Sequence, residues 1–98
     1  MIKHQTTKND NKVKVTFVQP YNPELSQVSV VGDFNSWTPG ENKMVKRNNG
    51  TCSASITLDP GEQYLFRYFS NGGVWFNDEA ADGYAPGEHG TDNCIVLT

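Results

Sequence analysis

Residues 51–58 read TCSASITL, and their pattern is the clearest indication of the fold. Apolar side chains stand at every second position, and serine and threonine hydroxyls fill the positions between them. A period of two places the apolar side chains on one face of a β-strand and the polar ones on the other. The stretch therefore predicts an antiparallel sheet with one buried face and one face in water.

The residues before this strand predict a β-hairpin. Residues 43–47 are strand-like, and Asn-Asn-Gly at residues 48–50 separates them from the strand. An Asn-Gly pair between two such runs is a strong hairpin signal, because both residue types tolerate a positive φ. Asp-Pro-Gly at residues 59–61 predicts the next turn.

Strand-like runs continue on both sides of the hairpin. They cover residues 12–17, 27–31, 63–70, 74–76 and 94–97. In the run 63–70 the aromatic positions 64, 66 and 68 share one face, so Arg67 faces the opposite way. No segment has a helical period of useful length. About seven short antiparallel strands separated by Pro, Gly and Asn turns predict an all-β, immunoglobulin-like β-sandwich.

The composition supports a single domain. Ninety-eight residues with 36% hydrophobic content can bury one modest core, but a deep cavity is hard to enclose at this length. Residues 3–11 are polar and unpatterned, so we expect residues 1–11 to form a flexible N-terminal tail before one domain over residues 12–98. Residues 77–92, rich in Asp, Gly and Ala, are expected to form a loop. The start at Met1, just ahead of the first strand, favours a complete small protein.

The charge and hydropathy of the chain limit which binding partners and which cellular compartment we expect. The net charge is -3 and the pI is about 5.2, without the basic surplus that binds phosphates, so we expect neither nucleic acid nor a membrane as partner. No apolar stretch approaches the roughly 20 residues of a membrane span, and the first residues lack a secretory signal, so we expect a cytoplasmic protein. Cys52 and Cys94 lack CxxC spacing and are expected to be small buried side chains, not a disulfide.

Two tryptophans point to the function. Trp37 follows the turn-forming residues 32–36, GDFNS, and Trp75 follows residues 71–74, NGGV. A flat indole at a strand end is a rigid apolar plate with few rotamers to freeze. Such a plate suits a ligand with weakly apolar faces and a rim of hydroxyl groups, as sugars have. The alternative is that both indoles are packing residues that seal the end of the sandwich.

Four motifs resemble a known family. They are VVGDFNSW at residues 30–37, LDPG at 58–61, YLFRY at 64–68, and Asn-Gly at 71–72 leading to Trp75 and Asp78. Through them, nearly the whole chain resembles the early-set domains at the front of isoamylases and glycogen branching enzymes. This family is carbohydrate-binding module family 48, and it includes the glycogen-binding domain of the AMP-activated protein kinase β subunit. The resemblance implies an early-set sandwich that binds α-glucan and catalyses no reaction.

The resemblance also implies the binding residues. In glycogen-binding members, two tryptophans, a basic residue on the strand between them, and a threonine and an asparagine before the last strand form the sugar site. By motif, these roles fall on Trp37, Arg67, Trp75, Thr91 and Asn93. The expected ligand is an α-1,4-linked glucan oligosaccharide or polymer of the glycogen or starch type. The chain departs from the family at His89, where the kinase subunit has a leucine, and at Cys52, a position that is often aromatic.

Other kinds of chemistry lack the residues they need. The acidic side chains crowd one loop, whereas glycoside hydrolysis needs two carboxyl groups facing each other across a cleft, so we expect no enzyme. His4 and His89 are not at zinc-ligand spacing, and Ala80 stands where a calcium loop needs an oxygen ligand, so we expect neither metal nor cofactor. The alternative function is that of an interaction domain, whose surface with the tryptophans and the arginine docks on a glycan-metabolising enzyme or on a second copy of the chain. We expect a monomer or a weak homodimer.

Overall fold

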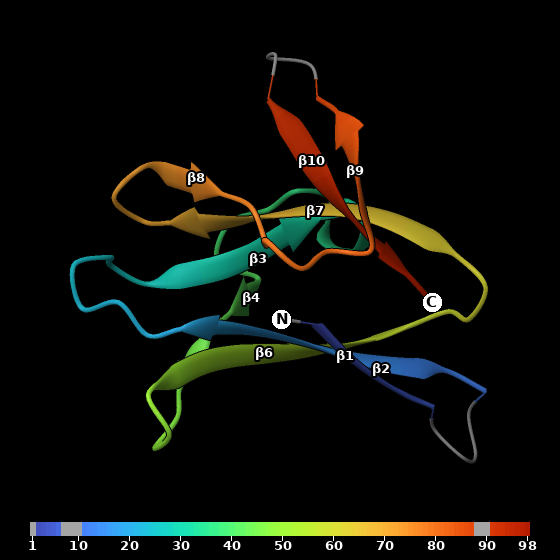
Figure 1. The fold of residues 1–98 in the computed structure, drawn as a ribbon, viewed down its shortest axis with the longest axis horizontal. Helices are drawn as coiled ribbons and strands as arrows, with labels where there is room; N and C mark the ends of the chain where they lie inside the picture. The colour runs from blue at the N-terminus through green and yellow to red at the C-terminus, as the bar shows by residue number, and fades with distance from the viewer. Residues whose placement is uncertain (1, 7–10, 88–90) are drawn as a thin grey trace.

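The computed structural model of the chain, which describes residues 2–6, 11–87 and 91–98, consists of two antiparallel sheets packed face to face (Figure 1). One sheet has four strands in the order β1 (Ile2–Thr6), β2 (Val13–Pro20), β6 (Thr51–Leu58) and β5 (Val45–Lys46). The other has the order β4 (Asn42–Lys43), β3 (Val28–Gly32), β7 (Gln63–Ser70), β10 (Asp92–Leu97) and β9 (Gly83–Pro86), and β8 (Val74–Phe76) also pairs with β7. The expected all-β, immunoglobulin-like sandwich is confirmed.

Strand β6 has the alternation that the sequence predicts. Its inward side chains Cys52, Ala54 and Leu58 are buried. Ser55 and Thr57 on the other face are exposed. Ser53 also belongs to the outer face but is buried, because Arg47 crosses it and donates from Nε to its Oγ at 2.8 Å. An outward position can therefore be covered by a long neighbouring side chain.

The hairpin that precedes β6 is also present. β5 pairs with β6, with Val45 opposite Ser53. In the turn, Gly50 has a φ of 80°, and the Oδ1 of Asn49 accepts a hydrogen bond from Thr51 N at 3.3 Å. The glycine alone provides the left-handed backbone, and the asparagine contributes a side-chain hydrogen bond.

Two edge strands correct the expectations from sequence. The flexible tail expected over residues 1–11 is wrong for Ile2–Thr6, which form β1 and pair with β2 along its first half. The loop expected over residues 77–92 contains β9, which pairs with β10. Backbone groups make these pairings, so a polar or Gly-Ala edge strand has no apolar period that would reveal it. Residues 1 and 7–10 lie outside the described residues.

Aromatic rings fill the core between the two sheets. The ring of Phe17 lies 4.8 Å from that of Phe66 and 6.4 Å from that of Tyr68, both edge to face. Cys52 and Cys94 are buried free thiols, as expected. Since Phe66 and Tyr68 point inward, Arg67 between them on β7 points away from the core. The described residues contain no helix long and apolar enough to cross a membrane.

Candidate functional site

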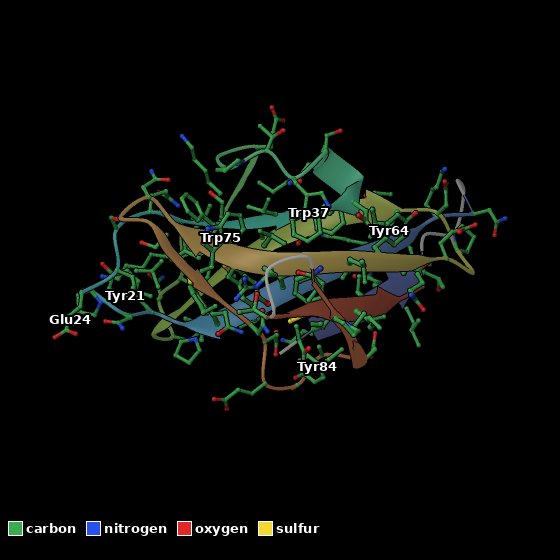
Figure 2. All side chains as sticks on the ribbon, turned by 90° about the horizontal axis from the view of Figure 1, so that it is seen from above. Tyr21, Glu24, Trp37, Tyr64, Trp75 and Tyr84 are labelled. Carbon is green, nitrogen blue, oxygen red and sulfur yellow. The ribbon has the colours of Figure 1, made fainter. Side chains whose placement is uncertain are left out.

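A groove of about 790 Å³ lies on the outer side of the six-stranded sheet. It is lined by Asp33, Trp37, Leu65, Arg67, Trp75, Pro86, Gly87, Thr91 and Asn93. Figure 2, seen from above, labels both tryptophans and shows Trp37 between Trp75 and Tyr64 in this view. The structure thus brings together all five residues for which the sequence predicts a binding role. His89 lies outside the described residues.

A tight turn after β3 presents Trp37. The 3-10 turn η1 (Asp33–Asn35) is followed by Ser36 and Trp37 with φ of 55° and 57°, both in the left-handed region. A bulky residue in this region is an outlier that costs about 1–2 kcal/mol. Trp37 N donates to Gly32 O at 2.9 Å, and the Asn35 amide binds Gly32 N and Val30 O. Strained backbone of this kind collects at ligand sites, where surrounding contacts hold it in place.

The carboxylate of Asp33 fixes the indole of Trp37. Its Oδ1 accepts a hydrogen bond from Trp37 Nε1 at 2.9 Å, and its Oδ2 accepts one from Leu65 N at 2.9 Å. The indole is therefore tied to the first half of β7 through one side chain. Asp33 is a groove residue that the sequence reasoning did not assign, although it belongs to the motif around Trp37.

Trp75 is carried by β8 and supported by β7. It stands opposite Phe69 in the β7–β8 pair, and the two rings are 4.6 Å apart at an angle of 50°. Trp75 remains 42% exposed, which is high for so large an apolar side chain. One side of the indole thus packs on the sheet, and the rest is open to a ligand.

Arg67 lies between the two tryptophans along β7. Its Cζ is 5.8 Å from the centroid of the Trp75 ring, which is within cation–π range. Its Nε donates to Asn77 Oδ1 at 2.7 Å, and its Nη1 donates to Thr91 Oγ1 at 3.4 Å. The guanidinium is thereby connected to the residue directly after β8 on one side and to the residue directly before β10 on the other. Asn77 is a second residue of the site that the sequence reasoning did not assign.

The β9 and β10 strands supply the remaining polar groups. Asn93 is paired with Ala85, and Gly87 N, directly after β9, donates to Thr91 O, directly before β10, at 2.8 Å. A Cβ at Gly87 would lie 2.4 Å from the Thr91 carbonyl oxygen, closer than real Cβ atoms approach. The glycine therefore allows the backbone contact that brings Thr91 to the groove.

Asp78, two residues after the end of β8, points into the core and is buried and ionised. Its Oδ2 accepts hydrogen bonds from Tyr68 Oη at 2.7 Å and Gln19 Nε2 at 3.2 Å, and its Oδ1 accepts one from Ala80 N at 2.8 Å. Burial by itself raises the pKa of Asp78, but lowering contributions, the largest of them the hydrogen bond from Tyr68 and the next that from Ala80, leave the pKa below its ordinary value. Burial raises the pKa of the Tyr68 hydroxyl, which stays a donor. No three His, Cys, Asp or Glu side chains of the described ranges group as metal ligands would.

The fold and the groove define a small all-β module with an open binding surface that displays two indoles. Residues 4–85 match the family model of carbohydrate-binding module 48, the isoamylase N-terminal domain, and the chain belongs to this family. The resemblance that the motifs predict is thus confirmed. By its description, this family consists of carbohydrate-binding modules.

A relative at the sequence level is a 1,4-alpha-glucan branching enzyme, GlgB, of Aquifex aeolicus (strain VF5). The two are 33% identical over 73 residues, which cover 71% of this chain and 11% of the enzyme. The chain thus spans about a tenth of the length of this curated relative. The enzyme's activity belongs to a much longer protein.

Proposed function

We propose that this chain is a noncatalytic module that binds α-1,4-linked glucan in the groove over β7. The observation that carries the proposal is that Trp37, Arg67 and Trp75 line one open groove. Each indole would stack on the face of a glucose ring, and Arg67, Thr91 and Asn93 would bond to ring hydroxyls. Membership of a carbohydrate-binding family and the similarity to a glucan branching enzyme support this ligand.

The expected affinity is modest. Two stacked rings and a few hydrogen bonds that compete with water leave about -4 to -7 kcal/mol, which corresponds to dissociation constants from millimolar to micromolar. A polymer such as glycogen offers many sites and raises the effective concentration, so weak single-site binding is sufficient for retention.

The groove chemistry favours binding over bond cleavage. Glycoside hydrolysis uses two carboxyl groups about 5–9.5 Å apart on either side of the scissile bond. Among the described residues that line the groove, Asp33 carries the single carboxylate. Both of its oxygens already accept hydrogen bonds from Trp37 and Leu65, which suits a positioning role.

Affinity electrophoresis in a gel cast with glycogen tests the proposal. The wild-type chain should be retarded, and Trp37→Ala and Trp75→Ala should each abolish the retardation. Tyr21→Ala is the matched control, because Tyr21 is 41% exposed, packs under Lys46 and does not line the groove. Unchanged wild-type mobility with glycogen, or equal loss in the tyrosine control, would exclude glucan binding by these two indoles.

A second candidate is a docking surface for a glycan-metabolising enzyme or for another copy of the chain. The half-exposed Trp75 and the neighbouring Arg67 favour it, since both residue types are frequent anchors of protein interfaces. Self-association predicts a mass that rises with concentration in analytical ultracentrifugation and falls back in Trp75→Ala. A glycogen-binding chain of constant mass would exclude the self-associating form.

A further inference from the structure

The amide of Asn77 joins the groove arginine to the start of β10. Its Oδ1 accepts a hydrogen bond from Arg67 Nε at 2.7 Å, and its Nδ2 donates to the Asp92 carbonyl oxygen at 2.9 Å. Turning the amide over would set donor against donor and acceptor against acceptor, so the two bonds together fix its orientation. Asn77 is half-buried and does not line the groove. It can therefore influence a ligand only through its neighbours.

Three contacts restrain the guanidinium of Arg67. Asn77 holds Nε, Thr91 Oγ1 lies 3.4 Å from Nη1, and the Trp75 ring centroid lies 5.8 Å from Cζ. Because the guanidinium is planar, a bond at Nε together with a ring against it sets the direction of both terminal nitrogens. Among the described residues, Asn77 and Thr91 accept from two of the five N–H groups of Arg67, and three remain for solvent or ligand.

We propose that Asn77 is a positioning residue that sets the Arg67 guanidinium for the ligand, an inference that rests on the proposed glucan binding. A free arginine side chain loses rotamer freedom when a ligand immobilises it, and a side chain already fixed in the free protein avoids most of this loss. The bond between Asn77 and Arg67 is the shortest of the contacts that hold the guanidinium. Removing it should weaken binding of maltoheptaose about 3- to 10-fold.

A double-mutant cycle measured by calorimetry with maltoheptaose separates this role from a structural one. Asn77→Ala should weaken binding several-fold in the wild-type background and should change nothing further in an Arg67→Ala background. A loss of the same size in both backgrounds overturns the proposal, because Asn77 would then act through the backbone at Asp92. Circular dichroism confirms that each variant is folded.

Asn77→Asp separates the contribution of the amide oxygen from that of the amide nitrogen. Its carboxylate still accepts from Arg67 Nε but has no donor for the Asp92 carbonyl oxygen. Binding within about twofold of wild type is expected if the arginine contact is the one that matters. Affinity as low as that of Asn77→Ala would assign the effect to the Asp92 bond and overturn the positioning role.

A measurement without ligand keeps the inference separate from the proposed function. In ¹H–¹⁵N spectra, the Nε–H signal of Arg67 should be sharp and protected from exchange in the wild type and lost in Asn77→Ala. An unprotected signal in the wild type, or an unchanged one in the variant, refutes the restraint itself. A protected signal in a wild-type chain that does not bind maltoheptaose refutes the glucan function while retaining the restraint.

Discussion

The hydrogen bond between Tyr68 and Asp78 should make a large, pH-dependent contribution to stability. Asp78 is 1% exposed and Tyr68 is fully buried, and the bond between Oη and Oδ2 measures 2.7 Å. Tyr68→Phe removes one donor from a buried carboxylate and adds no volume. Hydrogen bonds to charged groups contribute about 1.5–3 kcal/mol, and in the variant Oδ2 of Asp78 keeps Gln19 Nε2 as a donor. A loss of about 2 kcal/mol lowers the Tm of a domain of this size by about 8–16 °C.

The sign of the pH dependence follows from the lowered pKa of Asp78. A carboxyl group whose folded pKa lies below its unfolded value contributes stability above the unfolded pKa and loses it as pH falls through the folded one. Here both values lie at or below 3.8. Because the Tyr68 hydroxyl favours the charged form, Tyr68→Phe raises the folded pKa and cancels part of this contribution. The difference between wild type and variant should therefore be largest near neutral pH and shrink below pH 3.8.

Thermal unfolding followed by circular dichroism from neutral to strongly acidic pH measures this difference. Tyr64→Phe is the matched control, since Tyr64 lies on the same strand and face and its hydroxyl has no hydrogen-bond partner among the described residues. The control should change stability by less than about 0.5 kcal/mol. A difference between Tyr68→Phe and wild type that stays constant over the whole pH range would refute a bond to an ionised carboxylate. Equal stability of the two variants would refute the contribution altogether.

Three further substitutions have expected outcomes. Ser36→Gly should increase the free energy of unfolding by about 0.5–1 kcal/mol and so raise the Tm, because glycine adopts the observed φ of 55° without strain. An unchanged or lower Tm in calorimetry contradicts this. Gly87→Ala should destabilise the chain by about 1–3 kcal/mol and weaken glycogen retardation, because its Cβ displaces the Thr91 carbonyl; wild-type behaviour in both assays would argue against a close contact there. Phe69→Ala should weaken glycogen retardation while changing stability by less than about 1 kcal/mol, since Phe69 supports Trp75 on the outer face; an unaltered mobility would show that the indole needs no such support.

The alternation of side chains predicted much of the sheet and the direction of one binding residue. In β7 every second side chain from Phe66 to Ser70 is buried, so the outward position of Arg67 followed from the sequence alone. The convergence of Trp37 and Trp75 did not, because they are far apart in the chain and meet only through the β3–β7 and β7–β8 pairings. The likeness of motifs to a known family supplied that information instead.

Asp33 and Asn77 illustrate what a sequence pattern leaves out. Each lies within the stretch of a tryptophan motif, but its function in the structure depends on one hydrogen bond to another strand, with Leu65 N in the case of Asp33 and with Asp92 O in the case of Asn77. A side chain that joins two strands depends on register, and register is fixed only when the sheets assemble. The edge strand β1 was missed for a related reason, since its backbone pairs with β2 whatever its side chains are.

The groove and the core share one short segment, and this sharing links binding to stability. Along residues 75–78, Trp75 and Asn77 serve the groove, while Phe76 and Asp78 face inward. Both inward side chains contact Tyr68, Phe76 through its ring at 5.3 Å and Asp78 through its carboxylate. Trp75 and Phe76 are adjacent residues of β8 and point to opposite faces, and Asn77 and Asp78 follow directly, so fixing the inward pair also restrains the outward pair. A core substitution at Tyr68 should therefore loosen the indole and the amide that the groove requires, so that glucan affinity falls together with stability.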